Sequence, residues 1–573
     1  MQSQAARTRW VKLTPPVNSM NIAAHRLTPS ATASTGSWWR GATIYQIYPR
    51  SFLDTNGDGI GDLPGILQKL DYVASLGVDA VWISPFFKSP MADFGYDIAD
   101  YRAVDPLFGT IADFEALVAK AHSLGLKVII DQVLSHTSDQ HAWFEESRQS
   151  RDNPKADWYV WAEARADGTP PNNWLSIFGG VAWQWEPRRG QYYLHNFLAQ
   201  QPDLNFHNPQ VQRASLENLR FWLERGVDGL RLDAINFCFH DPQLRDNPPR
   251  APHERKATGF KNDNPYGYQW HRHNNTQPEM LPFLEELRRL LDGFPDTVAL
   301  GEISSDDSTA TVAEYTQPGR LHMAYSFELL SNESSPAHIR TTVETLQRRA
   351  PESWPCWTVS NHDVERVVSR WGRNRPSLPH FATQLTALLC ALRGSMCFFQ
   401  GEELGLAEAD VPFEALRDPY GIAFWPAFKG RDGCRTPMPW ESTDRGGFSK
   451  ANPWLPLPPQ HLELSVAAQE RDPSSALHGF RRLLAWRRAH PLLVTGDIEF
   501  LASTDSVLAF RRFDAQESLL AAFNLSPDPA SVSLPGLAVT RAIGGHGLPE
   551  GSFDDGALSL PGHGVAFLQL SAR

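Results

Sequence analysis

Two charged residues lie near the end of an apolar run in the middle of the chain. The run spans 227–234, and Arg231 and Asp233 stand two positions apart in it. In a β-strand this spacing places both side chains on one face. Because buried charges cost free energy unless they are paired or used, the pair predicts either a structural ion pair or an active-site carboxylate with a partnering arginine.

Further polar side chains follow other apolar runs of the chain. The third run leads to His136, the fifth to Glu302 and the seventh to the pair His362 and Asp363. Carboxylates that converge repel each other, so a protein gathers them where acid–base or nucleophilic chemistry needs them. Asp233, Glu302 and Asp363 are therefore the candidate catalytic carboxylates.

The elements that must position these residues alternate in type. Eight short apolar runs occur along the chain, which are 43–48, 80–85, 127–133, 227–234, 297–303, 322–329, 354–360 and 395–400. Segments with helical periodicity, such as 65–76 and 111–124, lie between them. Strands that alternate with helices imply a parallel sheet. Eight such strands predict an α/β fold, a (β/α)8 TIM barrel, whose catalytic groups lie at the C-terminal ends of the strands.

The connections between these runs suggest how the chain is divided. The barrel is predicted over 38–135 and 207–489. The intervening segment, 136–206, is rich in Trp, Tyr, Gly and Pro and lacks a clear helical period, which predicts an inserted subdomain B after the third strand. Short alternating strands with Gly and Pro turns predict a C-terminal antiparallel β-sandwich domain over 490–573.

The composition is that of a globular protein, with 42% hydrophobic and 21% charged residues. A net charge of -12 argues against nucleic acid as a partner. No run of eighteen apolar residues occurs, so no membrane span is predicted. Five cysteines without C-x-x-C spacing favour a reducing, cytoplasmic compartment. Residues 1–37 are polar and predict a disordered leader, or sequence upstream of a later start such as Met20.

These motifs resemble those of the α-amylase superfamily of retaining α-glucoside hydrolases, over nearly the whole chain from Trp38. The oligosaccharide α-glucosidases, which include oligo-1,6-glucosidase, maltase and α-glucosyl transfer enzymes, are the subgroup most similar to it. The motifs that carry the resemblance are Gln201-Pro-Asp-Leu-Asn205, Gly-x-Arg-x-Asp ending at Asp233, Gly-Glu at Glu302, Asn-His-Asp at Asp363 and the segment 431–440.

The resemblance implies a role for each of the three carboxylates. Asp233 would be the nucleophile, Glu302 the general acid and then the base, and Asp363 would hold sugar hydroxyls and help to distort the ring. A retaining glycosidase needs two carboxyls about 5–5.5 Å apart, one ionised and one protonated. Arg231 is expected to keep Asp233 ionised, and burial to keep Glu302 protonated.

The same resemblance implies a closed first sugar subsite. Asp93 and Tyr96 match the residues that close it. Tyr96 would stack on the glucose ring and Asp93 would bind the distal hydroxyls, paired with Arg431 or, alternatively, with Arg435. Such a blind pocket would release one glucose from a non-reducing end.

Four further side chains are candidates for contact with the sugar. His136 and His362 stand in motif positions and suit hydrogen bonds to hydroxyls in the first subsite. Phe178 and Phe197, in the inserted segment, are candidate aromatic walls, although plain packing explains them equally well.

The loop 54–62 carries oxygen ligands at alternate positions, which are Asp54, Asn56, Asp58 and Asp62 with the carbonyl of Ile60. Hard cations prefer such oxygen sets. The loop resembles the opening of an EF-hand loop, but Gly65 stands where the bidentate Glu would be. A capped turn is the alternative. The family resemblance implies a structural Ca²⁺ or Mg²⁺.

Two positions depart from the family pattern or bear on substrate choice. Ser135 replaces the usual Asn before His136, so any role of that Asn is in doubt. Ala234 follows the nucleophile, where Val tends to accompany α-1,6 preference and Thr or Ala α-1,4 preference. The smaller side chain favours maltose-like substrates.

The sequence thus predicts an exo-acting retaining α-glucosidase, monomeric or homodimeric, that acts on maltose and short α-glucosides. It would also transfer glucose to alcohol or phenol acceptors. An α-1,6-acting enzyme and a transferase or isomerase, such as trehalose synthase or sucrose isomerase, are the alternatives. A catalytically silent relative is disfavoured because the chain keeps all three carboxylates.

Overall fold

The computed structural model describes residues 37–255, 264–372 and 379–571. Eight parallel strands form one sheet in the order β11-β10-β9-β5-β2-β1-β13-β12. Their bounds are Thr43–Ile47 (β1), Ala80–Ile83 (β2), Lys127–Val133 (β5), Gly229–Asp233 (β9), Val298–Ile303 (β10), Met323–Ser326 (β11), Cys356–Trp357 (β12) and Ser395–Phe399 (β13). A parallel bridge between Ala324 and Pro355 joins the two edges, so the sheet nearly closes. The predicted (β/α)8 class is confirmed, and each strand lies within a predicted run.

The barrel strands have two different faces. In β9, Leu230 and Leu232 belong to the large hydrophobic core that also contains residues of the surrounding helices. A separate cluster fills the inside of the barrel, with Trp82, Leu300 and Tyr325 among its members. Because side chains alternate along a strand, Arg231 and Asp233 of β9 project to the inside.

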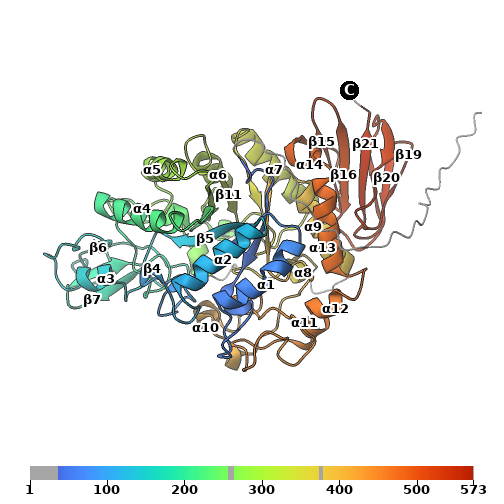
Figure 1. Ribbon diagram of the computed structural model, residues 1–573. Helices are drawn as coiled ribbons and strands as arrows, with labels where there is room; N and C mark the ends of the chain where they lie inside the picture. The colour runs from blue at the N-terminus through green and yellow to red at the C-terminus, as the bar shows by residue number, and fades with distance from the viewer. Residues whose placement is uncertain (1–36, 256–263, 373–378, 572–573) are drawn as a thin grey trace, which may run out of the picture. The chain divides into compact units, whose positions relative to one another are not determined.

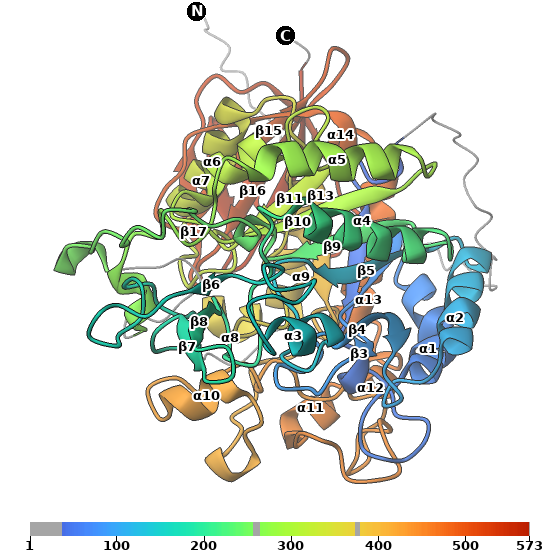
Figure 2. The same cartoon turned by 90° about the vertical axis from the view of Figure 1, so that its left-hand side faces the viewer.

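Helices cover the outer face of this sheet, and Figure 2 shows α2, α4 and α5 outside β5, β9 and β10. Their starts carry capping side chains, such as the Thr110 and Asp113 capping box of α2 and Ser335 of α7. The bounds are Leu63–Ser75 (α1), Ile111–Ser123 (α2), Pro209–Leu223 (α4), Met280–Asp292 (α5), Ser308–Tyr315 (α6), Pro336–Arg349 (α7), Val367–Gly372 (α8), Pro379–Ala391 (α9) and Ala476–Arg488 (α13).

Two excursions from the barrel carry site residues. After β2, the chain forms the strand pair Phe87–Lys88 (β3) and Asp100–Val104 (β4). After β5 comes a three-stranded antiparallel sheet with a short helix, made of Ala142–Ser147 (α3), Trp161–Ala162 (β6), Trp183–Glu186 (β7) and Gln191–Leu194 (β8). The six residues of α3 are too few to show a helical period in the sequence.

A long irregular stretch after β13 contains only short helices among the described residues. These are Phe413–Ala415 (η5), Pro419–Phe424 (α10), Pro459–Glu463 (α11) and Val466–Gln469 (α12). Short 3₁₀ turns occur elsewhere at Pro49–Ser51 (η1), Ile235–Phe237 (η2), Pro252–Glu254 (η3) and Pro265–Tyr268 (η4). In the described part of the chain, no helix is long and apolar enough to cross a membrane.

The C-terminal segment forms two antiparallel sheets, β14-β15-β16-β21-β18 and β17-β20-β19, with an apolar cluster shared between them. Figure 1 shows them, orange to red, beside α9 and α13. The bounds are Leu492–Thr495 (α14), Asp497–Phe500 (β14), Val507–Phe513 (β15), Ser518–Asn524 (β16), Ala530–Ser533 (β17), Val539–Ala542 (β18), Ser552–Asp554 (β19), Ala557–Leu560 (β20) and Val565–Leu570 (β21).

One buried arginine ties these sheets to the barrel. Arg512 of β15 is fully buried and donates to the carbonyls of Ala391 at 2.8 Å, Leu493 at 2.6 Å and Gly496. Burial lowers the pKa of Arg512 to about 9. Its hydrogen bonds therefore offset a large desolvation cost.

We predict that Arg512→Met lowers the apparent melting temperature by several degrees, because three buried carbonyls lose their donor and each costs about 1–3 kcal/mol when unsatisfied. Differential scanning calorimetry measures the effect. The matched control is Arg511→Met, since Arg511 pairs with half-exposed Glu499 and such pairs contribute about 0–1 kcal/mol. Equal effects of the two substitutions would contradict this role for Arg512.

Candidate active site

A buried arginine holds three carboxyl groups at the C-terminal ends of adjacent strands. Nη1 of Arg231 lies 2.8 Å from Oδ1 of Asp131 and 2.6 Å from Oδ1 of Asp233. Its Nη2 lies 2.6 Å from Oε1 of Glu302. Strands β5, β9 and β10 are neighbours in the barrel, which aligns their ends. The predicted nucleophile and acid thus share one guanidinium.

Burial controls the protonation of this group. It raises the pKa of Asp233 and of Glu302 to about 7, and Arg231 opposes both shifts. The sequence predicts that Arg231 keeps Asp233 ionised. The guanidinium acts in that direction, but burial outweighs it and Asp131 adds repulsion. Two such carboxyls titrate as a pair, so the pair retains one proton near neutral pH.

Asp363 has the opposite electrostatic balance. Burial raises its pKa, but the positive charges of Arg431 and Arg435 hold the pKa of this carboxyl well below its ordinary value. Its Oδ1 accepts from Nη1 of Arg431 at 3.1 Å and from Nη2 of Arg435 at 2.9 Å. Asp363 is therefore ionised at neutral pH.

A second arginine closes one side of the site. Nη2 of Arg431 donates to Oδ1 of Asp93 at 2.7 Å and to Oδ1 of Asp418 at 2.8 Å. Its Nε also contacts Asp418, at 3.1 Å. Asp93 therefore pairs with Arg431, and Arg435 contacts Asp363 instead. Gln201 donates to the other oxygen of Asp93 at 3.2 Å.

The aromatic and histidine side chains are also brought together. The hydroxyl of Tyr96 lies 3.0 Å from Oδ2 of Asp131 and 2.6 Å from Nε2 of His362. The Tyr96 and His362 rings stack with centroids 5.2 Å apart. His136 lies 3.1 Å from the Gln201 side chain, and burial lowers its pKa to about 4, so it is neutral.

These residues enclose one cavity of about 730 Å³, part of it open to solvent. Rings of Phe178 and Phe197 lie on its wall, with centroids 6.2 Å apart. Nine of the predicted site residues line it, which are Asp93, Tyr96, His136, Phe178, Phe197, Asp233, Glu302, Asp363 and Arg431. Arg231 and His362 lie behind this lining and support it through the contacts above.

Several residues of the site were missed from sequence. Asp131 stands at the end of the third strand and could have been found by that position. Tyr325, in β11, contacts both Arg231 and Glu302, but a lone tyrosine in an apolar run has no distinguishing signal. Asp418 lies in the irregular stretch after β13, where no periodicity marks it.

The loop 54–62 is held by its own hydrogen bonds. Asp54 accepts from the backbone N–H groups of Gly57 and Gly59, and Asn56 donates to Asp58. Asp62 caps α1 by accepting from the N–H of Gly65 at 2.7 Å. Within the described residues, no group of three or more His, Cys, Asp or Glu gathers into a metal site.

The donor chemistry of this loop partly fits the expected cation. Asp54, Asn56, Asp58 and the Ile60 carbonyl are oxygen donors of the kind that Ca²⁺ and Mg²⁺ prefer. Asp62 differs from them because its carboxylate is engaged by Thr55 and the start of α1. The ion stays a prediction.

Comparison with known proteins places this geometry in a family. Residues 46–496 match the model described as alpha amylase, catalytic domain. The chain belongs to this family. It is 55% identical over 537 residues to a probable alpha-glucosidase of Rhizobium meliloti (strain 1021), covering 93% of this chain and 97% of that protein.

Two further proteins are also similar to the chain. An oligo-1,6-glucosidase of Parageobacillus thermoglucosidasius is 36% identical, with 87% of this chain and 92% of that protein covered. The crystal structure of an alpha-glucosyl transfer enzyme has a TM-score of 0.92 and 64% identity, covering 93% of this chain and all of that one. The protein is thus a glucoside hydrolase or transferase of the alpha-amylase family.

We predict that Asp418→Asn raises the KM for a short α-glucoside about tenfold with a smaller change in kcat. The substitution removes a charged partner that holds Arg431 against Asp93, and a hydrogen bond to a charged group contributes about 1.5–3 kcal/mol. Steady-state kinetics measure it. Asp410→Asn, in an exposed pair with Lys429, is the control and should leave KM unchanged. An unaltered KM in Asp418→Asn would refute the role assigned to Asp418.

Proposed function

We propose that the protein is an exo-acting retaining α-glucosidase that forms a covalent glycosyl-enzyme. The observation that carries this proposal is the sharing of one buried guanidinium by Asp233 and Glu302, in a cavity that the Asp93–Arg431 pair closes. Glycosidases of this kind need one ionised and one protonated carboxyl, and retention of configuration also needs the two groups close together, about 5–5.5 Å apart. Contact with the same guanidinium keeps Asp233 and Glu302 close.

The reaction proceeds in two steps. An oxygen of ionised Asp233 attacks the anomeric carbon while protonated Glu302 gives its proton to the departing glycosidic oxygen, so the C1–O bond breaks and the leaving sugar departs as an alcohol. Glu302, now ionised, then removes a proton from water. The resulting attack on C1 releases Asp233 and frees glucose.

The electrostatics of the cavity suit this sequence. The coupled pair retains one proton near neutral pH, which supplies the acid and leaves one carboxylate as the nucleophile. Asp363 is ionised and accepts hydrogen bonds from sugar hydroxyls. His136 and His362 are held neutral by burial, which adds polar contacts without further charge.

The closed side of the cavity supports exo action. Asp93 and Arg431 present charged hydrogen-bonding groups where distal hydroxyls of a terminal glucose would lie, and Tyr96 lines the same cavity with its hydroxyl on Asp131. A chain that continued past this sugar would collide with that pair. One glucose is therefore removed from a non-reducing end.

Substrate choice rests on the residue after the nucleophile. Ala234 lines the cavity beside Phe237 and Ile177. Its small side chain leaves room at the acceptor side, which favours maltose and other α-1,4 substrates. A hydroxyl of an alcohol or phenol replaces water in the second step, which gives transglucosylation. The likeness to an alpha-glucosyl transfer enzyme favours transfer as a second activity of the same site.

Purified protein incubated with maltose tests the proposal. We expect free glucose as the main product, with the α-anomer first in a proton NMR time course, and a higher kcat/KM for maltose than for isomaltose. First release of the β-anomer would contradict retention. Trehalose as the main product would instead support an isomerase, and a preference for isomaltose an α-1,6-acting enzyme.

In the same assay, Asp233→Asn is expected to lower kcat by about 10⁶-fold, the order seen when a covalent nucleophile is removed from a protease. The control is Asp228→Asn, just before the other end of β9, where Asp228 pairs with Lys127 outside the cavity. It should retain turnover. A folded Asp233→Asn protein with near-normal rates would refute the assignment of the nucleophile.

We also propose that the loop 54–62 binds a structural Ca²⁺ or Mg²⁺ through Asp54, Asn56, Asp58 and the Ile60 carbonyl. Treatment with a chelator is expected to lower the melting temperature, because an ion bound only by the folded state stabilises it. Turnover below the melting transition should persist, since the loop gives no side chain to the cavity. An unchanged melting temperature would contradict the site.

A further inference from the structure

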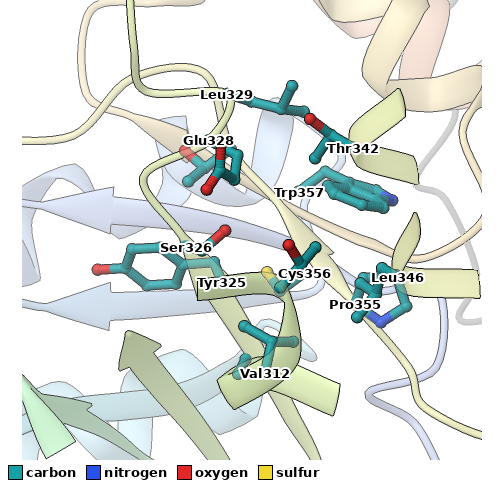
Figure 3. A pocket seen from close by; sticks show the side chains of 13 residues that line it. Val312, Tyr325, Ser326, Glu328, Leu329, Thr342, Leu346, Pro355, Cys356 and Trp357 are labelled. Atoms are coloured by element: carbon teal, nitrogen blue, oxygen red, sulfur yellow. The ribbon is translucent and has the colours of Figure 1, made fainter. Parts of the chain in front are cut away.

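Tyr325 lies on the inside of the barrel, beside the two carboxyls of the proposed reaction. It belongs to β11, next to β10, and its side chain is buried in the cluster that contains Trp82. A second, small cavity lies on the other side of β11, between α6, α7 and β12. Figure 3 shows the Tyr325 ring pointing away from Cys356 and Trp357 at that cavity. The hydroxyl therefore faces the active site.

The hydrogen bonds of this hydroxyl have a fixed direction. The Tyr325 oxygen lies 3.2 Å from Nε and 2.8 Å from Nη2 of Arg231. A guanidinium only donates, so the tyrosine oxygen must accept from it. The hydroxyl has one hydrogen, and Oε1 of Glu302 is the acceptor, at 2.9 Å. Burial raises the pKa of Tyr325 well above its ordinary value, so the hydrogen stays in place.

The two carboxyl oxygens of Glu302 therefore have different hydrogen-bond surroundings. Oε1 faces two donors, the Tyr325 hydroxyl and Nη2 of Arg231. A proton on Oε1 would point at one of these donors, which is unfavourable. Oε2 accepts only the N–H of Ala234, at 3.1 Å, among the described residues. A protonated carboxyl oxygen retains capacity for such a contact.

We propose that Tyr325 is a positioning residue that confines the acid proton of Glu302 to Oε2, the oxygen beside the residue that follows Asp233. The inference rests on the proposed function, because it assumes that Glu302 is the general acid. Without this hydroxyl, Oε1 loses one of its two donors. The carboxyl can then hold its proton on either oxygen, and the form with the proton on Oε1 cannot serve the leaving group.

The test compares Tyr325→Phe with the unaltered protein on two substrates that need acid assistance to different degrees. Maltose has a poor leaving group and depends on the proton, whereas 4-nitrophenyl α-glucoside has a good one. We use kcat/KM because it reports the first chemical step. We expect about a two- to tenfold loss on maltose, because sharing the proton between two oxygens halves the productive form and the weakened acid gives up its proton less readily. The nitrophenyl glucoside should lose less than twofold, since it needs little of the roughly 10²–10⁴-fold that general acid catalysis contributes in full.

The pH dependence of kcat/KM is a second measurement. It would not shift if Tyr325 contributed only packing. The hydroxyl stabilises ionised Glu302, so its removal raises the pKa of Glu302. The alkaline limb of kcat/KM on maltose, where the acid proton is lost, should therefore move to higher pH by about one unit. Tyr315→Phe is the matched control, because Tyr315 is buried on α6 and its hydroxyl has no partner among the described residues.

The outcomes separate the inference from the proposed function. Glu302→Gln should lose far more rate on maltose than on the nitrophenyl glucoside. If it does not, Glu302 is not the acid, and both the proposed function and this inference fail. If Glu302→Gln behaves as expected but Tyr325→Phe loses both substrates equally, or neither, with an unmoved alkaline limb, the inference alone is overturned.

Discussion

The buried positive charge of Arg231 determines how the carboxyl groups of the site are placed and protonated. A guanidinium placed inside a barrel must be compensated, because its desolvation costs several kcal/mol, roughly, even after relaxation. Three carboxyls converge on it, from β5, β9 and β10. Since one positive charge cannot support three negative ones at low cost, a proton remains in the cluster near neutral pH. The arrangement of the strands thus creates an acid and a base together.

A second group of charged residues at the cavity has the reverse balance. Arg431 and Arg435 lie against Asp363, and Arg431 also meets Asp93 and Asp418. Positive charge there is sufficient to keep Asp363 ionised. One group therefore holds a proton, and the other holds fixed negative charge paired to arginine. The cavity thus offers a sugar both a proton donor and strong hydrogen-bond acceptors.

Much of this could be predicted from sequence, because strand ends in a parallel barrel share one rim. That constraint alone brought Asp233, Glu302 and Asp363 together, since each follows an apolar run of its own. It could not decide which of Arg431 and Arg435 pairs with Asp93, because both lie in an irregular stretch whose path depends on tertiary contacts. Nor could it find Tyr325, whose role comes from the direction of one hydroxyl. Nor could it weigh burial against Arg231 in the pKa of Asp233, because burial is a property of the whole fold.

The backbone at Ala234 adopts a left-handed conformation, with φ of 38°. This turn directs the N–H of Ala234 to Glu302 and so joins the segment of the proposed nucleophile to the proposed acid through main-chain atoms. Any residue except proline supplies that N–H, so the link does not depend on which side chain occupies the position. The left-handed backbone, in turn, costs about 1–2 kcal/mol for ordinary residues and more for branched ones. A substitution at position 234 thus keeps the hydrogen bond to Glu302, but only residues that tolerate a left-handed backbone fit there at low cost.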